Sequence, residues 1–137
     1  MSYFVDTSVL LLAVGTEGPA RVACRNFLAM AANRGAAVHI SVEAAQEYVF
    51  HRSRRMGRAT ALAEGARLPD MYVVHDFGLE VYERSLSLMG TSALRGRDAV
   101  HAATALLAGF TQIVSADHDF ESVPGLHRID PATFTSS

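Results

Sequence analysis

Lysine and tryptophan are absent from this 137-residue sequence, and cysteine occurs once. Cys24 has no partner within the chain, so an intramolecular disulfide is excluded and a reducing compartment, the cytoplasm, is the expected location. Its neighbours Val22, Phe27 and Leu28 follow a helical pattern, so we expect Cys24 to lie in the core. All twelve basic residues are arginine, for which a coding sequence rich in G and C is the simplest explanation.

Long apolar runs and an excess of charge are missing as well. No uninterrupted apolar stretch reaches the length that spans a bilayer, so we expect no membrane segment. Asp6 interrupts the apolar N-terminus and no basic stretch precedes it, which argues against a signal peptide. The formal net charge of −2 argues against a protein that binds nucleic acid through overall positive charge, although a local basic strip is compatible with it.

The apolar pattern predicts one α/β domain over residues 1–137. Half of the residues are hydrophobic, which is enough for a core at this length. Strands alternate with helices along the chain, and this order favours a mostly parallel sheet. Pro69-Asp70 is expected to break a helix, and residues 51–58 form a polar stretch rich in arginine. The strands are expected at 3–5, 37–40, 71–75, 112–115 and 127–129, and the helices at 9–14, 20–33, from 41 onward, 59–67, 78–89 and 98–107.

Four acidic residues stand where these elements are expected to meet. Asp6 follows the first strand, Asp117 follows the fourth strand, and Asp98 lies in the first turn of the helix that leads into the fourth strand. Glu47 lies about two turns into the helix after the second strand, judged by helical rise. Because parallel sheets bind ligands at the carboxyl ends of their strands, all four carboxylates can converge on one rim.

Each acid alone also has an ordinary structural explanation. Asp6 and Asp98 can cap helices, a role worth about 0.5–2 kcal/mol each, and Asp117 can be a turn residue. Several carboxylates on one rim repel one another, however, and that arrangement favours a bound cation. Oxygen ligands select Mg²⁺ or Mn²⁺ over zinc, and such sites serve phosphoryl chemistry with a metal-activated water.

Four segments resemble the motifs of PIN domains, in the order that the family shows. The resemblance implies a PIN-like three-layer α/β/α domain with a short, mostly parallel five-stranded sheet. It also implies an Mg²⁺-dependent endoribonuclease that cleaves RNA phosphodiester bonds with metal-activated water, with Mn²⁺ able to substitute. Single-domain members of this size are commonly VapC toxins, neutralised by a cognate VapB-type antitoxin and often homodimeric. The segments are Phe4–Leu10, Ile40–Tyr48, Arg97–Ala105 and Val114–Phe120.

The resemblance also implies roles for individual residues. Glu43 competes with Glu47 for the acid of the second motif, one helical turn away, and the spacing from Ser41 favours Glu47. Ser115 stands where the family usually has threonine, and this change keeps the hydroxyl. The catalytic residues are Asp6, Glu47, Asp98 and Asp117; the metal ligands are Asp6, Asp98 and Asp117; the supporting residues are Ser8, Ser115 and Asp119.

Several of these assignments keep a structural alternative. The hydroxyls of Ser8 and Ser115 serve equally well in caps and turns, and Asp119 fits a solvated loop. His101, three residues after Asp98, fits a packed histidine better than a proton relay, and the family has no histidine ligand at His118. Five arginines close in sequence to these acids have two interpretations: they hold RNA phosphates, or they form a solvated surface. They are Arg52, Arg54, Arg55, Arg95 and Arg97.

Two other classes of function fit part of the pattern. A different Mg²⁺-dependent phosphoester hydrolase would use Asp6 as nucleophile, but such enzymes usually carry a second acid two residues later, where this chain has Ser8. A PIN fold that binds RNA or protein without cleaving it is the second alternative. The complete set of acids disfavours this second alternative.

Overall fold

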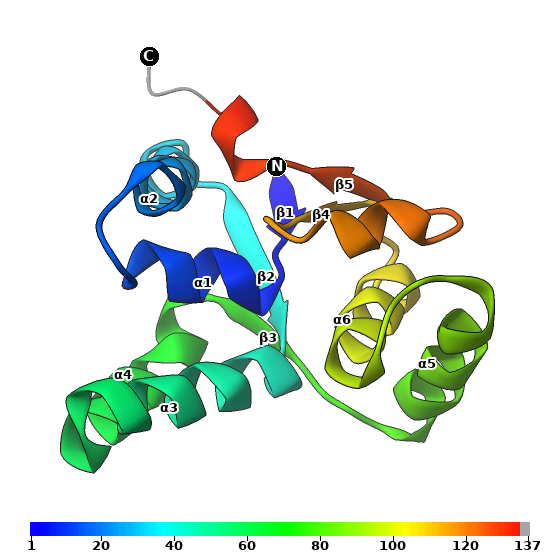
Figure 1. Cartoon of the computed structure of the whole chain (residues 1–137), viewed down its shortest axis with the longest axis horizontal. Helices are drawn as coiled ribbons and strands as arrows, with labels where there is room; N and C mark the ends of the chain where they lie inside the picture. The colour runs from blue at the N-terminus through cyan, green and yellow to red at the C-terminus, as the bar shows by residue number, and fades with distance from the viewer. Residues whose placement is uncertain (135–137) are drawn as a thin grey trace.

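Short parallel strands form the central layer of the structure, a computed structural model that describes residues 1–134 (Figure 1). Strands β1 (Ser2–Phe4), β2 (Ala37–Ser41) and β3 (Val73–His75) form one sheet, in the order β1-β2-β3. Strands β4 (Gln112–Val114) and β5 (His127–Ile129) form a second. A parallel bridge between Val5 and Val114 joins the sheets. The five predicted strands are therefore present and parallel, but they form two small sheets in place of one.

Two layers of helices cover the strands (Figure 1). Helices α1 to α4 lie on one side, and α5 and α6 lie on the other. The three-layer α/β/α arrangement predicted from the sequence is confirmed. The helices are α1 (Thr7–Ala13), α2 (Pro19–Asn33), α3 (Val42–Met56), α4 (Arg58–Met71), α5 (Leu79–Thr91) and α6 (Gly96–Leu107), with short 3₁₀ helices η1 (His118–Ser122) and η2 (Pro131–Thr133).

Alternation of side chains along the strands divides the core into two clusters. Phe4 and Ile113 pack with buried residues of α5 and α6. Val5, Ile40 and Val114 face the other way and pack with buried residues of α1, α2 and α3. Successive residues of a strand point to opposite faces, so adjacent residues in β1 and β4 belong to different cores. Both helical layers are thereby held at the same strand ends.

One expectation about helix boundaries is wrong, and the extent of another helix is now defined. Most of the polar stretch 51–58 is the end of α3, which continues to Met56 and turns at Gly57, whose φ is +91°. Its arginines are accommodated because the guanidinium of Arg52 pairs with Glu64 on α4. Pro69 does not break α4 but lies inside its last turn. Proline has no backbone N–H, so Pro69 donates no hydrogen bond within the helix. The backbone pairing still continues past it, because Tyr72 N donates to Leu68 O at 2.9 Å.

The single cysteine lies in the core, as the sequence predicted. Cys24 is a buried residue of α2 and packs with the other residues of this core. Burial, together with the charge of Asp130, raises the pKa of the Cys24 thiol to about 11. Cys24 is therefore a packing residue with little thiolate character. None of the helices within residues 1–134 combines the length and hydropathy needed to cross a membrane.

Helix α4 packs tightly against α3 at Gly65, and this contact gives a testable prediction. A Cβ at position 65 would lie 2.5 Å from Cγ2 of Val49, a β-branched side chain with few rotamers. We expect Gly65→Ala to lower the free energy of unfolding by about 1–2 kcal/mol, because overpacking outweighs the gain in helix propensity. Urea denaturation measures this change.

Gly90→Ala in α5 is the matched control. No atom lies within 4 Å of a Cβ at this position, so only the propensity gain of about 0.5–1 kcal/mol should appear. Equal effects of the two substitutions would show that the α3–α4 contact is looser than described.

Candidate functional site

Asp6 lies at the centre of the candidate site, between β1 and α1. Its amide donates to Val114 O at 3.0 Å, which places it at the junction of the two sheets. Asp6 is only 3% exposed. It occupies the N-cap position of α1, yet its side chain makes no capping hydrogen bond. Instead Oδ2 accepts a hydrogen bond from Ser115 Oγ at 2.8 Å, so capping does not explain this residue.

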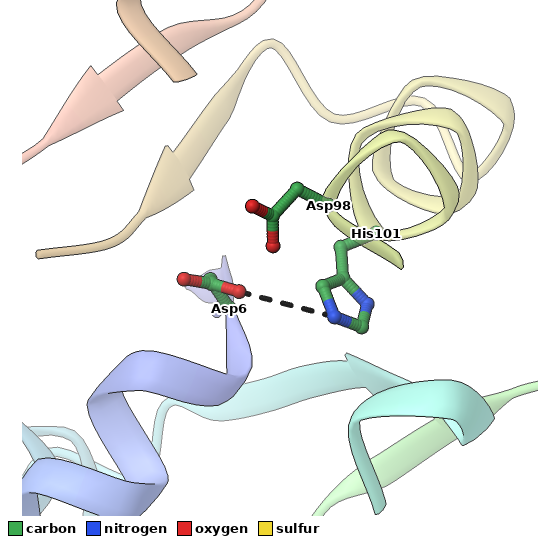
Figure 2. A group of neighbouring side chains, drawn as sticks. All are labelled: Asp6, Asp98 and His101. Carbon is green, nitrogen blue, oxygen red and sulfur yellow. Dashed lines mark ion pairs between the residues drawn. The ribbon is translucent and has the colours of Figure 1, made fainter. Parts of the chain in front are cut away.

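Asp98 reaches the same place from the first turn of α6. Together, Asp6, Asp98 and His101 each offer one ligand atom, and these atoms lie within 4.8 Å of one another (Figure 2). Burial and the negative charge of Asp6 raise the pKa of Asp98 to about 6; the charges of Asp117 and Glu47 add to the rise, and that of His101 opposes it. A carboxyl with this pKa is one that a divalent cation would stabilise in its ionised form.

Glu47 enters the site from α3. Ser41 caps this helix by accepting a hydrogen bond from Ala44 N at 3.0 Å, which sets the start of the helix and the position of its side chains. Glu47 Oε1 lies 2.7 Å from His101 Nε2 and accepts from Thr7 Oγ1 at 3.3 Å. Burial by itself would raise the pKa of Glu47, but the hydrogen bonds and positive charge around it prevail and lower the pKa.

Glu43, one turn earlier on α3, has a different environment. Its Oε1 lies 3.6 Å from Arg97 Nε, and Arg97 Nη1 lies 3.8 Å from Glu47 Oε2. Arg97 is largely exposed, so this contact lies at the edge of the site. Among residues 1–134 it is Glu47, not Glu43, that bonds to His101 and Thr7.

Asp117 and its neighbours form the fourth side of the site. Ser115 Oγ accepts from Asp117 N at 2.9 Å while it donates to Asp6. Ser8 Oγ accepts from Ala116 N at 3.2 Å, so both predicted serines bind this loop. Asp117 Oδ1 accepts from Asp119 N at 2.9 Å, so Asp117 does have the local turn role that was its structural alternative. Asp119 itself is exposed.

The predicted RNA-binding arginines are not equivalent. Arg52 forms two hydrogen bonds with Glu64, at 2.8 and 3.1 Å, and its side chain is only 12% exposed. It therefore braces α3 against α4. Arg54 is exposed and stacks over Phe50, with 5.7 Å from its guanidinium carbon to the ring centroid. Arg55 and Arg95 are also exposed.

Two residues of the site were undervalued or missed in the sequence. His101 is buried as expected of a packed histidine, but its ring also contacts Glu47 and Thr7. Burial would lower the pKa of His101, yet the hydrogen bond to Glu47 and the nearby carboxylates raise it. The spacing of three residues from Asp98, on one helix face, was its signal. Arg128 on β5 donates to Ser115 O at 2.6 Å and to Glu121 Oε1 at 3.0 Å, and no motif signalled it.

His118 does not join the site. It is exposed and lies 3.1 Å from Glu121 Oε1. That His118 is not a ligand stays a prediction from the family resemblance. The residues that the structure brings together are thus Asp6, Asp98, Glu47 and His101, with Asp117 on the adjoining loop.

Comparison with known proteins gives consistent matches over nearly the whole chain. The PIN domain family model matches residues 3–126. The chain is 36% identical over 130 residues to Ribonuclease VapC7 of Mycobacterium tuberculosis. The aligned region covers 93% of this chain and 90% of that protein.

Solved structures show the same fold at lower identity. A chain of DNA-bound VapBC from Salmonella typhimurium matches with a TM-score of 0.73 and 17% identity, covering 96% of this chain and 98% of that one. The sarcin–ricin loop cleaving toxin VapC20 of Mycobacterium tuberculosis matches with a TM-score of 0.71 and 19% identity, covering 87% and 92%. At these identities the structural matches concern the fold alone.

The crowded carboxylates predict that Asp98 lowers the stability of the metal-free protein. Its folded pKa of about 6 exceeds the ordinary value of 3.8, so the native state binds a proton more tightly and its stability falls as pH rises through this range. At pH 7 the ionised carboxylate carries the full penalty. We expect Asp98→Asn to raise the Tm of the chelator-treated protein at pH 7, by scanning calorimetry.

Asp76→Asn, at an exposed acid outside the site, is the control and should leave the Tm unchanged. The difference in Tm between Asp98→Asn and the unmodified protein should also shrink at pH 4, because Asp98 is then protonated in the folded protein. An Asp98→Asn variant with the same or a lower Tm at pH 7 would contradict the repulsion.

Proposed function

Because this chain belongs to the PIN-domain family, we propose that it is a metal-dependent endoribonuclease and the toxin of a toxin–antitoxin pair. The kinship with Ribonuclease VapC7 supports the ribonuclease activity. We further propose that the whole chain, residues 1–137, acts as a single PIN domain in the cytoplasm, in keeping with its one buried cysteine. The observation that carries the proposal is the meeting of the Asp6 and Asp98 carboxylates at the strand ends.

The donor set fits a hard divalent cation. Asp6 and Asp98 offer carboxylate oxygens within 4.8 Å of each other, and burial together with the negative charge of Asp6 raises the pKa of Asp98. We propose Mg²⁺ as the physiological ion, with Mn²⁺ able to substitute, and Asp6, Asp98 and Asp117 as the residues that hold it. A bound divalent cation would lower the pKa of an attacking water and stabilise charge on the phosphate oxygens.

The other residues of the site have separate proposed roles. Glu47, whose pKa is lowered, stays ionised at neutral pH and can accept a proton or orient a water through its carboxylate. Ser115 holds Asp6 by hydrogen bonding and connects it to the Asp117 loop, which Ser8 also binds. Asp119 contributes its amide to Asp117 and so orders the same loop.

The arginines near the site are the proposed contacts to RNA phosphates. Arg97 is exposed beside Glu43 and Glu47, and Arg95 precedes it at the start of α6. Arg54 and Arg55 lie seven and eight residues beyond Glu47 on α3, about 10–12 Å along the helix axis. Arg52 is withdrawn from this set because its guanidinium is engaged by Glu64. Phosphate contacts of this kind would position RNA without reading its sequence.

The first prediction for this function concerns the metal. RNA cleavage by the purified protein should require Mg²⁺ or Mn²⁺, stop with EDTA and return when the ion is restored. Hydrolysis by an attacking water should leave 5′-phosphate and 3′-hydroxyl ends, which end-specific ligation can identify. Cleavage that persists without metal, or that leaves 2′,3′-cyclic phosphate ends, would disprove the proposal. A simple phosphate ester hydrolysed in preference to RNA would favour the phosphoester hydrolase alternative.

The second prediction separates the two candidate acids of α3. Glu47→Gln removes the carboxylate that bonds to His101 and Thr7, so we expect cleavage to fall by at least about 100-fold, the lower range for general acid–base groups. Glu43→Gln removes only a contact to the exposed Arg97 and should cost less than about fivefold, within the range of surface ion pairs. A larger loss in Glu43→Gln would place the second-motif acid one helical turn earlier.

We also propose a VapB-type antitoxin as the protein partner and a homodimer as the assembly. Solved structures with this fold include VapBC complexes. Helices α1, α3 and α4 offer two neighbouring cavities of about 330 and 340 Å³ that share Val14. One is lined by arginines of α3, and the other mostly by apolar residues that include Leu10, Leu68 and Met71, together with Glu64 and Arg67. A segment with apolar and acidic residues would complement both.

Coexpression with a neighbouring antitoxin should give a stable complex without ribonuclease activity. Met71→Glu places a charge in the apolar cavity and should weaken the complex by tenfold or more, measured by calorimetry. Leu62→Glu is the matched control, since Leu62 lies on the same helix, is equally exposed at 56% and lines neither cavity. Equal affinities of the two variants for the antitoxin would show that the antitoxin binds a surface other than these cavities.

A further inference from the structure

His101 connects the two helical layers at the candidate site. It is carried by α6 and is fully buried, with 0% exposure. Its Nδ1 lies 2.7 Å from Ser41 Oγ, and its Nε2 lies 2.7 Å from Glu47 Oε1. Ser41 ends β2 and caps α3, and Glu47 lies on α3. The imidazole is therefore the buried polar link between α6 and the acid of α3, whereas Arg97 of α6 contacts Glu47 from the exposed edge at 3.8 Å.

The hydrogen bond between His101 and Glu47 has a definite direction. Ser41 Oγ already accepts a hydrogen bond from Ala44 N, and its one hydroxyl proton can be donated to Nδ1. On the other side, the Glu47 carboxylate offers only acceptors, so the short contact requires a proton on Nε2. In the neutral ring Ser41 donates to Nδ1, in the doubly protonated ring Nδ1 donates to Ser41, and in both Nε2–H donates to Glu47.

This direction decides between two roles for the ring. A histidine coordinates a metal ion through an unprotonated nitrogen, whereas Nε2, the nitrogen nearest the acids, carries a proton here. Nε2 also lies 4.0 Å from Asp6 Oδ1 (Figure 2) and 3.0 Å from Thr7 Oγ1, so its surroundings are acceptors on several sides. Both the neutral Nε2–H ring and the doubly protonated ring satisfy these contacts. The Nδ1–H tautomer does not.

We propose that His101 is a positioning residue and not a metal ligand: it donates Nε2–H to Glu47 and holds this carboxylate beside Asp6 before a cation binds. Ser41 orients the ring through Nδ1, and Thr7 supports the same carboxylate oxygen. The inference rests on the proposed function only for the catalytic role of Glu47. The state of the ring itself is independent of any activity.

The test is the tautomer of His101, measured by long-range ¹H–¹⁵N NMR on the full chain labelled in histidine. The six histidines are distinguished by the signals missing in His101→Gln. In the metal-free protein we expect a proton on Nε2, and the same state when MgCl₂ is added to saturation. Loss of the Nε2 proton, before or after Mg²⁺ is added, would overturn the proposal.

Two variants extend the test to metal binding and activity. His101→Gln keeps an N–H donor near Glu47, and His101→Leu removes it. We expect Mg²⁺ affinity, measured by calorimetry, to change less than about threefold in His101→Gln, and RNA cleavage to be at least tenfold faster in His101→Gln than in His101→Leu. A Mg²⁺ affinity at least tenfold weaker in a folded His101→Gln would identify a ligand and contradict the proposal.

The two proposals fail in different ways. If the unmodified protein does not cleave RNA yet keeps the Nε2 proton in Mg²⁺, the proposed function is wrong and the positioning of Glu47 stands. If it cleaves RNA but Nε2 loses its proton, the proposed function stands and the positioning of Glu47 by His101 is wrong. The NMR measurement is made on the unmodified protein, and if His101→Gln does not fold, substitution of the other five histidines in turn leaves the remaining signals for His101.

Discussion

Repulsion between carboxylates buried at the strand ends is the constraint on which the rest of the site depends. Asp6 is almost completely buried, and Asp98 lies close enough that its pKa rises to about 6. Such a pair is unfavourable unless other groups stabilise it, and the chain supplies these groups from several elements. Ser115 donates to Asp6, and His101 and Thr7 bond to the neighbouring Glu47. The remaining negative charge is what a divalent cation would neutralise.

The arrangement of helices in two layers explains how residues far apart in the sequence reach this point. Alternation along β1 and β4 anchors one core on each face, so α3 and α6 are fixed to the same strand ends from opposite sides. His101 and Glu47 then meet across the rim at 2.7 Å. Ser41 serves both layers, since it caps α3 and bonds to His101.

The loop after β4 is held by a different set of contacts. Arg128 reaches from β5 to the carbonyl of Ser115, while Ser8 accepts from Ala116 N. These bonds keep Asp117 at the edge of the cluster, although its carboxylate also caps η1. The site thus combines Asp6 and Asp98, next to β1 and on α6, with a loop that hydrogen bonds from Ser8 and from Arg128 on the outer strand hold in place.

The sequence by itself determined the parallel α/β order, the buried Cys24 and the acidic positions at the ends of strands. These features depend on local hydrophobic periodicity and on residue types at fixed spacings, which are visible in one dimension. Only the tertiary structure decided that the strands form two sheets, that Arg52 pairs with Glu64, that Pro69 is tolerated within α4, and that His101 faces Glu47. Each of these depends on which residues distant in sequence come into contact, and on the burial and charge that the contact creates, so no local pattern encodes it.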